Sequence, residues 1–491
     1  MKLRPYRIRI KTGGVNVAVL HDETAHRLDL HVGDRVKLHA DRTTIICVLD
    51  VTHDHFPKHK IGLFAEAYEA LNLEPDDIID IQAADKPPSL LFIRAKLDGK
   101  RLSEEQLNEI VRDIVHGDLS DVEMTYFVSG CYAHGLNDNE TAALTRSIVK
   151  NGKTLQFKGR VVADKHCIGG VPGNRVTPIV VPIVVAAGVL MPKTSSRAIT
   201  SPAGTADAIE SVCNVTINAH RLMKIAKKVG GFMVWGGGVD LAAADDHMIK
   251  IRHPMSLDPE GMLLASIMAK KHSVSANHVL IDIPVGPGVK ILDRAHAQHL
   301  KKRFLKIGKM LGMKVQVIIT DGSQPIGNGI GPLLEMIDVM KVLKGDRDAP
   351  KDLREKALME AGTLLELTEK AKKGHGRHMA EEILRSGRAW HKFEQIIVAQ
   401  GKKRIPPLAK FSAQVCAQKA GRVSAIENKS ISHLARIAGA PKDVAAGLVL
   451  HKKLGYRVKK GEALYTIFAS SQERLNYALE FAKQSSGYRS I

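Results

Sequence analysis

The chain has 491 residues and carries 72 Lys and Arg against 52 Asp and Glu, a net charge of +20. This length is more than one hydrophobic core usually holds, so we expect three or more domains. Hydrophobic residues make up 44% and charged residues 25%, an ordinary balance for a globular protein. The five cysteines are scattered and form no CxxC pair, which fits a reducing compartment and argues against a disulfide framework or a zinc site.

The sequence favours a location in the cytoplasm. The longest apolar run, residues 178–192, is too short to span a bilayer comfortably and is predicted to be a buried helix or strand. The N-terminal MKLRPYRIRIKT alternates like a strand and lacks the apolar core of a signal peptide. We therefore expect a soluble, cytoplasmic protein without a membrane partner.

The positive charge fits either a nucleic-acid-binding protein or an enzyme for phosphorylated substrates. Aromatic residues make up only 4% of the chain, which leaves few side chains for stacking on bases. Lys and Arg are also spread along the chain rather than held in one tail. Small anionic ligands are therefore favoured, and a nucleic-acid partner is not expected.

The patterns along the chain predict a multidomain α/β fold. Short alternating runs come first, and a helical stretch then begins at a capping box formed by Ser103 and Gln106. After it, short apolar runs ending in glycine-bearing loops alternate with helices, as in a mixed or parallel-sheet α/β domain. The predicted parts are an N-terminal β-rich domain at 1–90, a helical domain at 97–155 plus about 245–273, an α/β domain at 156–244 plus about 274–404, and a C-terminal α+β domain at 405–491.

A glycine-rich stretch, KHCIGGVPGNR at residues 165–175, follows the apolar run RVVAD. Glycines after a strand let backbone N–H groups approach an oxyanion closely. Lys165 adds a positive charge and Thr177 a hydroxyl donor. The stretch is neither a P-loop nor a dinucleotide fingerprint. Taken alone, it is explained equally well as a tight turn with a surface lysine.

A second loop, KTSSRAITSPAGTAD at residues 193–207, surrounds Arg197 with hydroxyl groups. An arginine among hydroxyls suits a tetrahedral oxyanion. The alternative is a Ser/Thr-rich turn before a helix N-cap. Because ligands of α/β folds bind at the carboxyl ends of strands, the two loops together predict an anion site.

DKHCIGGV followed by SSRAITSPAGTADAIES resembles the thymidine and pyrimidine-nucleoside phosphorylase family. The family pattern there is D-K-H-S-T-G-G-V, then S-G-R-G-L-x-x-T-G-G-T-x-D-K-x-E. LAAADDHMIKIR, LLASIMAKK and the C-terminal GLVLHKKLGYRVKKGEAL agree as well, so the resemblance covers about residues 100–491. It implies phosphorolysis, in which inorganic phosphate attacks C1′ of a ribosyl group and the base leaves. No metal or other cofactor is implied, and a homodimer or higher homo-oligomer, with dimer contacts in the helical domain, is expected.

The resemblance also implies a site, position by position. Phosphate ligands fall on Lys165, Ser195 and Thr205. The extra N-terminal domain, the stretch SLDPEG and Cys167 in place of a serine look like the long branch of the family, which includes AMP phosphorylase and proteins called thymidine phosphorylases on similarity alone. In that branch the proton donor falls on Asp258. Nucleoside or nucleotide contacts fall on Gly170, Ser196, Arg197, Ala198, Ile199, Thr200, Ser201, Thr205, Ser266 and Lys290, with further base contacts at Arg252, Lys270 and His166.

Each of these residues also has a simpler explanation. Asp258 precedes a proline and fits an ordinary turn, although a buried carboxyl group there would protonate a departing purine. Lys290 would meet a 5′-phosphate, or be a solvated lysine at a strand end. Arg252 would bind a base carbonyl, or pair with Asp245 or Asp246.

His166 and Cys167 also allow more than one interpretation. His166 would either orient the phosphate or the base, or have a structural hydrogen-bonding role. Cys167 is predicted to be a small filler rather than a nucleophile. A non-catalytic relative that binds phosphorylated ligands, and an RNA-binding protein, remain alternatives to the enzyme.

Overall fold

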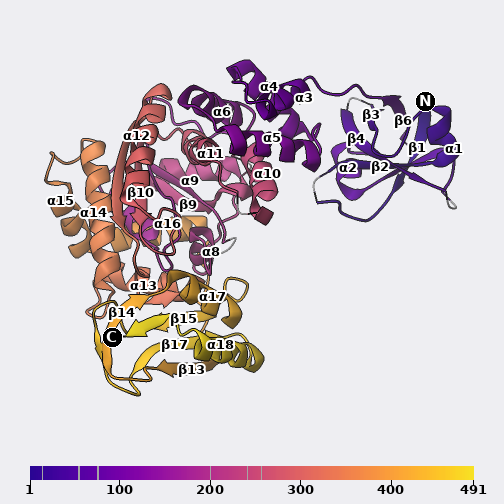
Figure 1. The fold of residues 1–491 in the computed structure, drawn as a ribbon. Helices are drawn as coiled ribbons and strands as arrows, with labels where there is room; N and C mark the ends of the chain where they lie inside the picture. Colours follow the sequence, from indigo (N-terminus) through magenta and orange to yellow (C-terminus); the bar gives the residue numbers. More distant parts are fainter. Residues whose placement is uncertain are drawn as a thin grey trace. The chain divides into compact units, whose positions relative to one another are not determined.

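The computed structural model describes residues 1–13, 15–41, 43–53, 56–74, 77–198, 201–239, 241–255 and 257–490. The chain forms two compact units, Met1–Gly152 with Ala243–Ser266, and Lys153–Ala242 with Ile267–Ile491. Figure 1 shows the helices and strands of the chain, which are described below for each unit. Two of the expected nucleotide contacts, Ile199 and Thr200, lie outside the described residues.

The first unit begins with a closed β-barrel of strand order β1–β5–β2–β4–β3–β6 (Figure 1). Alternate residues of β3, including Val36 and Leu38, are buried, so each strand turns one face into the barrel core. Closure pairs every edge strand, and the predicted β-rich N-terminal part is confirmed. The elements are β1 (Lys2–Arg7), β2 (Val17–His21), α1 (Asp22–Arg27), β3 (Arg35–Ala40), β4 (Thr43–Thr52), β5 (Lys60–Leu63), α2 (Ala65–Ala70) and β6 (Ile79–Ala83).

A helical bundle forms the rest of the first unit. The predicted capping box is present, because Gln106 N–H donates to Ser103 Oγ at 3.3 Å and Ser103 N–H donates to Gln106 Oε1 at 2.9 Å. Ser120 with Glu123 starts the next helix in the same way. The elements are α3 (Ser89–Leu97), α4 (Glu104–His116), α5 (Asp121–His134), α6 (Asp138–Lys150), α10 (Ala243–Arg252), η2 (His253–Met255) and the first half of α11 (Glu260–His272).

Parallel strands form the centre of the α/β part of the second unit. Sheet β11–β10–β7 and strand pair β8–β9 are both parallel, and a single parallel bridge between Val162 and Leu190 links them. The predicted parallel α/β arrangement is confirmed, with the two loops of interest at the carboxyl ends of β7 and β8. The strands are β7 (Ala163–Cys167), β8 (Met191–Ser195), β9 (Gly231–Trp235), β10 (His278–Val285) and β11 (Lys314–Asp321).

Helices surround these strands (Figure 1). Most of the long apolar run forms the helix α7, and its last two residues, Met191 and Pro192, begin strand β8. Residues 177–185 of α7 are all buried, which explains why no polar face is visible in the sequence. Helices α7, α13, α14, α15 and α16 contribute to one hydrophobic core. The helices are α7 (Thr177–Ala186), α8 (Thr205–Glu210), α9 (Ala219–Val229), η1 (Gly236–Gly238), α12 (Arg294–Met310), α13 (Pro332–Lys344), α14 (Lys351–Leu367), α15 (Gly376–Arg385) and α16 (Arg388–Gln400).

The C-terminal part has two small antiparallel sheets and two helices around their own core. The larger sheet has the strand order β12–β15–β17–β13. Its strand β12 precedes α13 in the chain and joins the sheet through the pairing of Gly329 with Val449. The elements are β12 (Gly329–Ile330), β13 (Phe411–Cys416), β14 (Gly421–Ile426), α17 (Asn428–Ala438), β15 (Gly447–Leu450), β16 (Arg457–Val458), β17 (Ala463–Ala469), α18 (Gln472–Gln484) and β18 (Tyr488–Ser490). Among the described helices, none has the length and apolar character needed to cross a membrane.

Candidate active site

Arg175 connects the glycine-rich loop after β7 to the hydroxyl-rich loop after β8 through hydrogen bonds. Arg175 donates from Nη1 to the Thr205 hydroxyl at 2.6 Å and from Nη2 to the Ala203 carbonyl at 2.8 Å. Its Nε pairs with the buried Glu335, and burial raises the pKa of that carboxyl group. The glycine-rich loop and the hydroxyl-rich loop therefore meet through a charged, hydrogen-bonded bridge.

The hydroxyl-rich loop presents two groups suited to an oxyanion. Ala206 N–H donates to the Ser196 carbonyl at 3.3 Å, which brings the two ends of the loop together. Thr205 Oγ accepts a hydrogen bond from Arg175, so its own proton is left to donate. Ser195 Oγ is buried and has no hydrogen-bond partner among the described residues. An oxyanion held here would satisfy a hydroxyl that is otherwise costly to bury.

Close backbone packing explains the glycines of the first loop. Gly170 has a φ of +99°, and a Cβ there would lie 2.8 Å from Val289 Cα and 2.9 Å from Lys290 N. At Gly173, a Cβ would lie 2.1 Å from the carbonyl oxygen of Ile326. A side chain at either position would clash with backbone. The loop is thereby packed against the segment that carries Lys290, whose side chain is exposed.

Lys165 belongs to a buried network of charges. Its ammonium group pairs with Glu360 of α14, and burial raises the pKa of Glu360. One turn earlier, Lys356 lies 2.7 Å from Asp282 of β10, which accepts from Thr320 at 2.6 Å. Burial disfavours the ammonium form of Lys356, but Asp282 together with Cys167 and Glu360 more than offsets burial, and the pKa of Lys356 is raised. To contact phosphate, Lys165 must therefore share or leave Glu360.

Asp164, the neighbour of Lys165, binds two buried lysines. It lies 2.6 Å from Lys271 Nζ and 3.2 Å from Lys193 Nζ. Burial lowers the pKa of Lys193 to about 7. Burial first, and then the ammonium groups of Lys271 and Lys193, hold the pKa of His166 well below its usual value. The imidazole of His166 is therefore neutral at pH 7, whichever role it plays.

Asp207 fixes the shape of the second loop. Its Oδ2 accepts from Ala198 N–H at 2.7 Å and from Gly204 N–H at 2.8 Å. Within the same turn, Ser201 Oγ donates to the Ala203 carbonyl at 3.1 Å. These bonds occupy the backbone N–H of Ala198, one of the expected nucleotide contacts.

Arg197 is held by structural partners. It lies 3.2 Å from Asp207, pairs with Glu210, and its guanidinium lies 4.8 Å from the ring centroid of Trp235. Its side chain is 34% exposed. The structure thus gives Arg197 a part in shaping the loop, and its contact with a nucleotide stays a prediction.

The expected base-binding and proton-donating residues of the first unit are neighbours. Ser266 Oγ donates to Asp245 Oδ2 at 2.7 Å, and Arg252 Nη2 lies 3.7 Å from Asp245 Oδ1. The ion pair that the sequence left as an alternative for Arg252 is therefore present. Arg252 Nη1 lies 3.8 Å from Asp258 Oδ1 and has no hydrogen-bond partner in the described part of the chain. The Asp258 side chain is 45% exposed, and Lys270, further along α11, is half-buried.

Three regions of the chain match models of known families. Residues 91–152 match "Glycosyl transferase family, helical bundle domain", residues 159–390 match "Glycosyl transferase family, a/b domain", and residues 422–489 match "Pyrimidine nucleoside phosphorylase C-terminal domain". An AMP phosphorylase from Methanococcus vannielii is 40% identical over 475 residues, 96% of this chain and 94% of the relative. This chain belongs to the thymidine/pyrimidine-nucleoside phosphorylase family.

Other relatives of similar identity are named as thymidine phosphorylases rather than AMP phosphorylases. A protein from Legionella pneumophila named "Putative thymidine phosphorylase" is 41% identical over 484 residues, 98% of this chain and 94% of the relative. Among solved structures, anthranilate phosphoribosyltransferase from Thermus thermophilus has a TM-score of 0.53 and 17% identity, covering 63% of this chain and 98% of that one. That likeness shows the fold alone.

Three residues of the second unit that were not among the predicted ones, Arg175, Glu360 and Asp207, each hold a predicted residue in place. In the first unit, Asp245 was expected only as a partner of Arg252, and its hydrogen bond with Ser266 was not predicted. Arg175 stands within the quoted glycine-rich stretch, so its charge was a visible signal. Glu360 lies 195 positions after Lys165, on a helix whose sequence gives no sign of the pairing. In the part of the chain that the structure describes, no three His, Cys, Asp or Glu side chains group to hold a metal ion.

Proposed function

We propose that this protein catalyses phosphorolysis of the N-glycosidic bond of a nucleoside monophosphate such as AMP, giving the free base and a ribose 1,5-bisphosphate. The observation that carries the proposal is the buried, unpartnered hydroxyl of Ser195 on the loop that Arg175 joins to the glycine-rich loop. Inorganic phosphate would accept from Ser195 and Thr205, and Lys165 would contribute charge. The 40% identical AMP phosphorylase supports this substrate.

The proposed chemistry needs positioning more than covalent help. The transition state has oxocarbenium character at C1′, so an anionic nucleophile held at the right face lowers the barrier through orientation and charge. Ser266 and Arg252 would hold the base, with Lys270 and the neutral His166 as further contacts. Lys290 and the loop residues Gly170, Ser196, Arg197, Ala198 and Ser201 would contact the nucleotide.

Asp258 is the proposed proton donor to the departing base. Its side chain is 45% exposed, so the bound base would have to bury this carboxyl group. Asp258→Asn keeps the shape of the side chain and removes the acid. The rate constant kcat should fall far more than KM rises, and equal effects on the two would refute the donor role.

Thymidine-type activity is the second candidate, and the Legionella pneumophila relative favours it by its name. One experiment separates the candidates. The full chain is incubated with phosphate and with AMP, other monophosphates, adenosine or thymidine, and free base is measured. Base release from monophosphates supports the first candidate, and release from thymidine alone supports the second. No release from any substrate contradicts both.

A further inference from the structure

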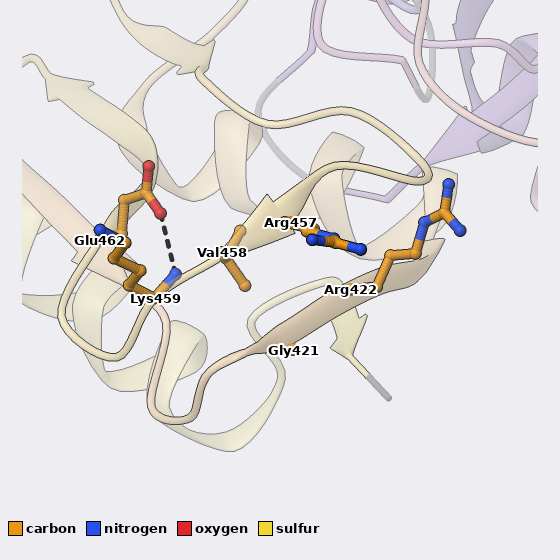
Figure 2. Close-up of a pocket in the computed structure, with 6 residues that line it drawn as sticks. All are labelled: Gly421, Arg422, Arg457, Val458, Lys459 and Glu462. Carbon is orange, nitrogen blue, oxygen red and sulfur yellow. Dashed lines mark hydrogen bonds between the residues drawn. The ribbon is translucent and has the colours of Figure 1, made fainter.

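An open pocket of about 660 Å³ lies in the C-terminal part of the second unit, on the sheet β16–β14–β18. This sheet is distinct from the parallel strands that carry the proposed active-site loops. The volume is within the range typical of small-molecule sites. The residues that line the pocket are Gly421, Arg422, Arg457, Val458, Lys459 and Glu462 (Figure 2).

Two arginines face each other across this short antiparallel ladder. Arg422 of β14 pairs in register with Arg457 of β16, and both side chains are exposed. Directly opposite residues of a sheet extend to the same face, and like charges there are destabilising. Figure 2 shows both guanidinium groups at one end of the pocket, with Lys459 at the other. An anion between the arginines would turn this repulsion into attraction.

The pocket contains too little negative charge of its own to balance these cations. Its single carboxylate, Glu462, already pairs with Lys452 and accepts from the backbone N–H of Lys459 at 2.9 Å (Figure 2). Arg422 donates from Nε to the Gly455 carbonyl at 2.7 Å, which fixes its guanidinium in place. Across the described residues, the Arg457 guanidinium and the Lys459 ammonium form neither a hydrogen bond nor an ion pair.

We propose that this pocket binds the phosphate group of a small phosphorylated ligand between Arg422 and Arg457, with Lys459 adding positive charge at the other end of the pocket. Guanidinium groups match phosphate oxygens with paired N–H donors, and an ammonium group adds a further charge. A phosphate monoester carries close to two negative charges at pH 7, which suits three cations better than a single carboxylate does. The ligand's phosphate comes either from a nucleoside monophosphate or from inorganic phosphate.

Hydrogen–deuterium exchange of the full chain tests this site without relying on activity. Exchange of peptides covering 419–424 and 455–462 is followed alone and with AMP, inorganic phosphate or adenosine. AMP should slow exchange in both segments, and adenosine, which lacks the phosphate, should not. Inorganic phosphate with the same effect identifies the free anion as the ligand, and AMP alone identifies the monoester.

The variant Arg457→Gln should lose this protection, and raising the salt concentration should weaken it in the wild type. Arg474→Gln, which removes an exposed arginine from α18 of the same part, should retain it. Neither residue belongs to the proposed phosphorolysis site, so base release measured in parallel separates failure of this inference from failure of the proposed function. Unchanged exchange with AMP and phosphate, equal protection in Arg457→Gln, or protection by an oligoribonucleotide alone would overturn the proposal.

Discussion

Lys165 and Glu360 form an ion pair in which both side chains are buried. Lys165 comes from the strand before the glycine-rich loop and Glu360 from α14. Lys165, the lysine proposed to bind phosphate, is therefore already paired with the carboxylate of Glu360. If the proposed function holds, phosphate and Glu360 compete for one ammonium group. The second oxygen of Glu360 has no hydrogen-bond partner among the residues described.

This competition predicts the behaviour of Glu360→Gln. Removing one partner of a buried pair leaves an uncompensated charge, so the free energy of unfolding should fall by about 3–5 kcal/mol. Phosphate should then restore more stability to the variant than it adds to the wild type, because it replaces the lost anion. Thermal unfolding with increasing phosphate measures this. The control Glu355→Gln removes an exposed carboxylate from the same helix. An equal response to phosphate in all three proteins would contradict the competition.

Ser195→Ala should separate stability from ligand binding. Because the Ser195 hydroxyl is buried without a partner, its removal should leave the free energy of unfolding unchanged or slightly higher. Affinity for phosphate should fall about 10-fold or more, the value of a hydrogen bond to a charged group. Isothermal titration with phosphate measures this.

The matched variant Ser211→Ala removes a buried hydroxyl that donates to the Ala208 carbonyl at 2.6 Å. It should lose about 1 kcal/mol of stability and bind phosphate normally. If Ser195→Ala bound phosphate as well as Ser211→Ala does, Ser195 would not be a phosphate ligand.

Lys193 predicts a pH dependence of stability. Burial lowers its pKa from 10.5 to about 7. Between these values the unfolded chain holds a proton on this amine that the folded chain has lost, so the free energy of unfolding rises with pH. The stability that the folded chain gains from this difference in protonation is lost as the pH falls toward 7.

The variant Lys193→Met removes this contribution. From pH 7 to pH 9, the free energy of unfolding of the wild type should rise by about 1–3 kcal/mol relative to that of the variant. Denaturant unfolding at several pH values measures it. Lys309→Met, which removes an exposed lysine, should leave the slope of the wild type unchanged. Parallel curves for wild type and Lys193→Met would contradict a lowered pKa for this lysine.

Lys290→Ala tests the preference for a monophosphate. Loss of a charged contact to the 5′-phosphate should lower kcat/KM for AMP by about 10- to 100-fold. The low activity on the nucleoside, which lacks that phosphate, should stay the same. Steady-state kinetics with AMP and adenosine measure this, with Lys309→Ala as the control of equal charge. Unchanged discrimination would remove Lys290 from the nucleotide site.

The local signals of the sequence predicted local structure. The capping box at Ser103, the parallel α/β pattern and the two loops were all visible in the residues themselves. The run at residues 178–192 showed burial but not whether it was helix or strand, since neither period appears in an all-apolar stretch.

The contacts of the candidate site were less visible. Glu360 reaches Lys165, and Asp245 reaches Ser266, only through tertiary packing. Arg197 is held by Trp235 and Glu210 from outside its loop as well as by Asp207 within it. Residue type and spacing predict which groups gather near a ligand. The pairing among buried charges depends on which helix covers which face of the sheet.

Phosphate-dependent release of base from AMP is the most direct test of the central claim. The full chain and Lys165→Ala are each incubated with AMP, with and without phosphate, and free adenine is quantified. Adenine should appear only with the wild type and only when phosphate is present. Adenine formed equally without phosphate, or formed as fast by Lys165→Ala, would contradict a phosphorylase built on these two loops.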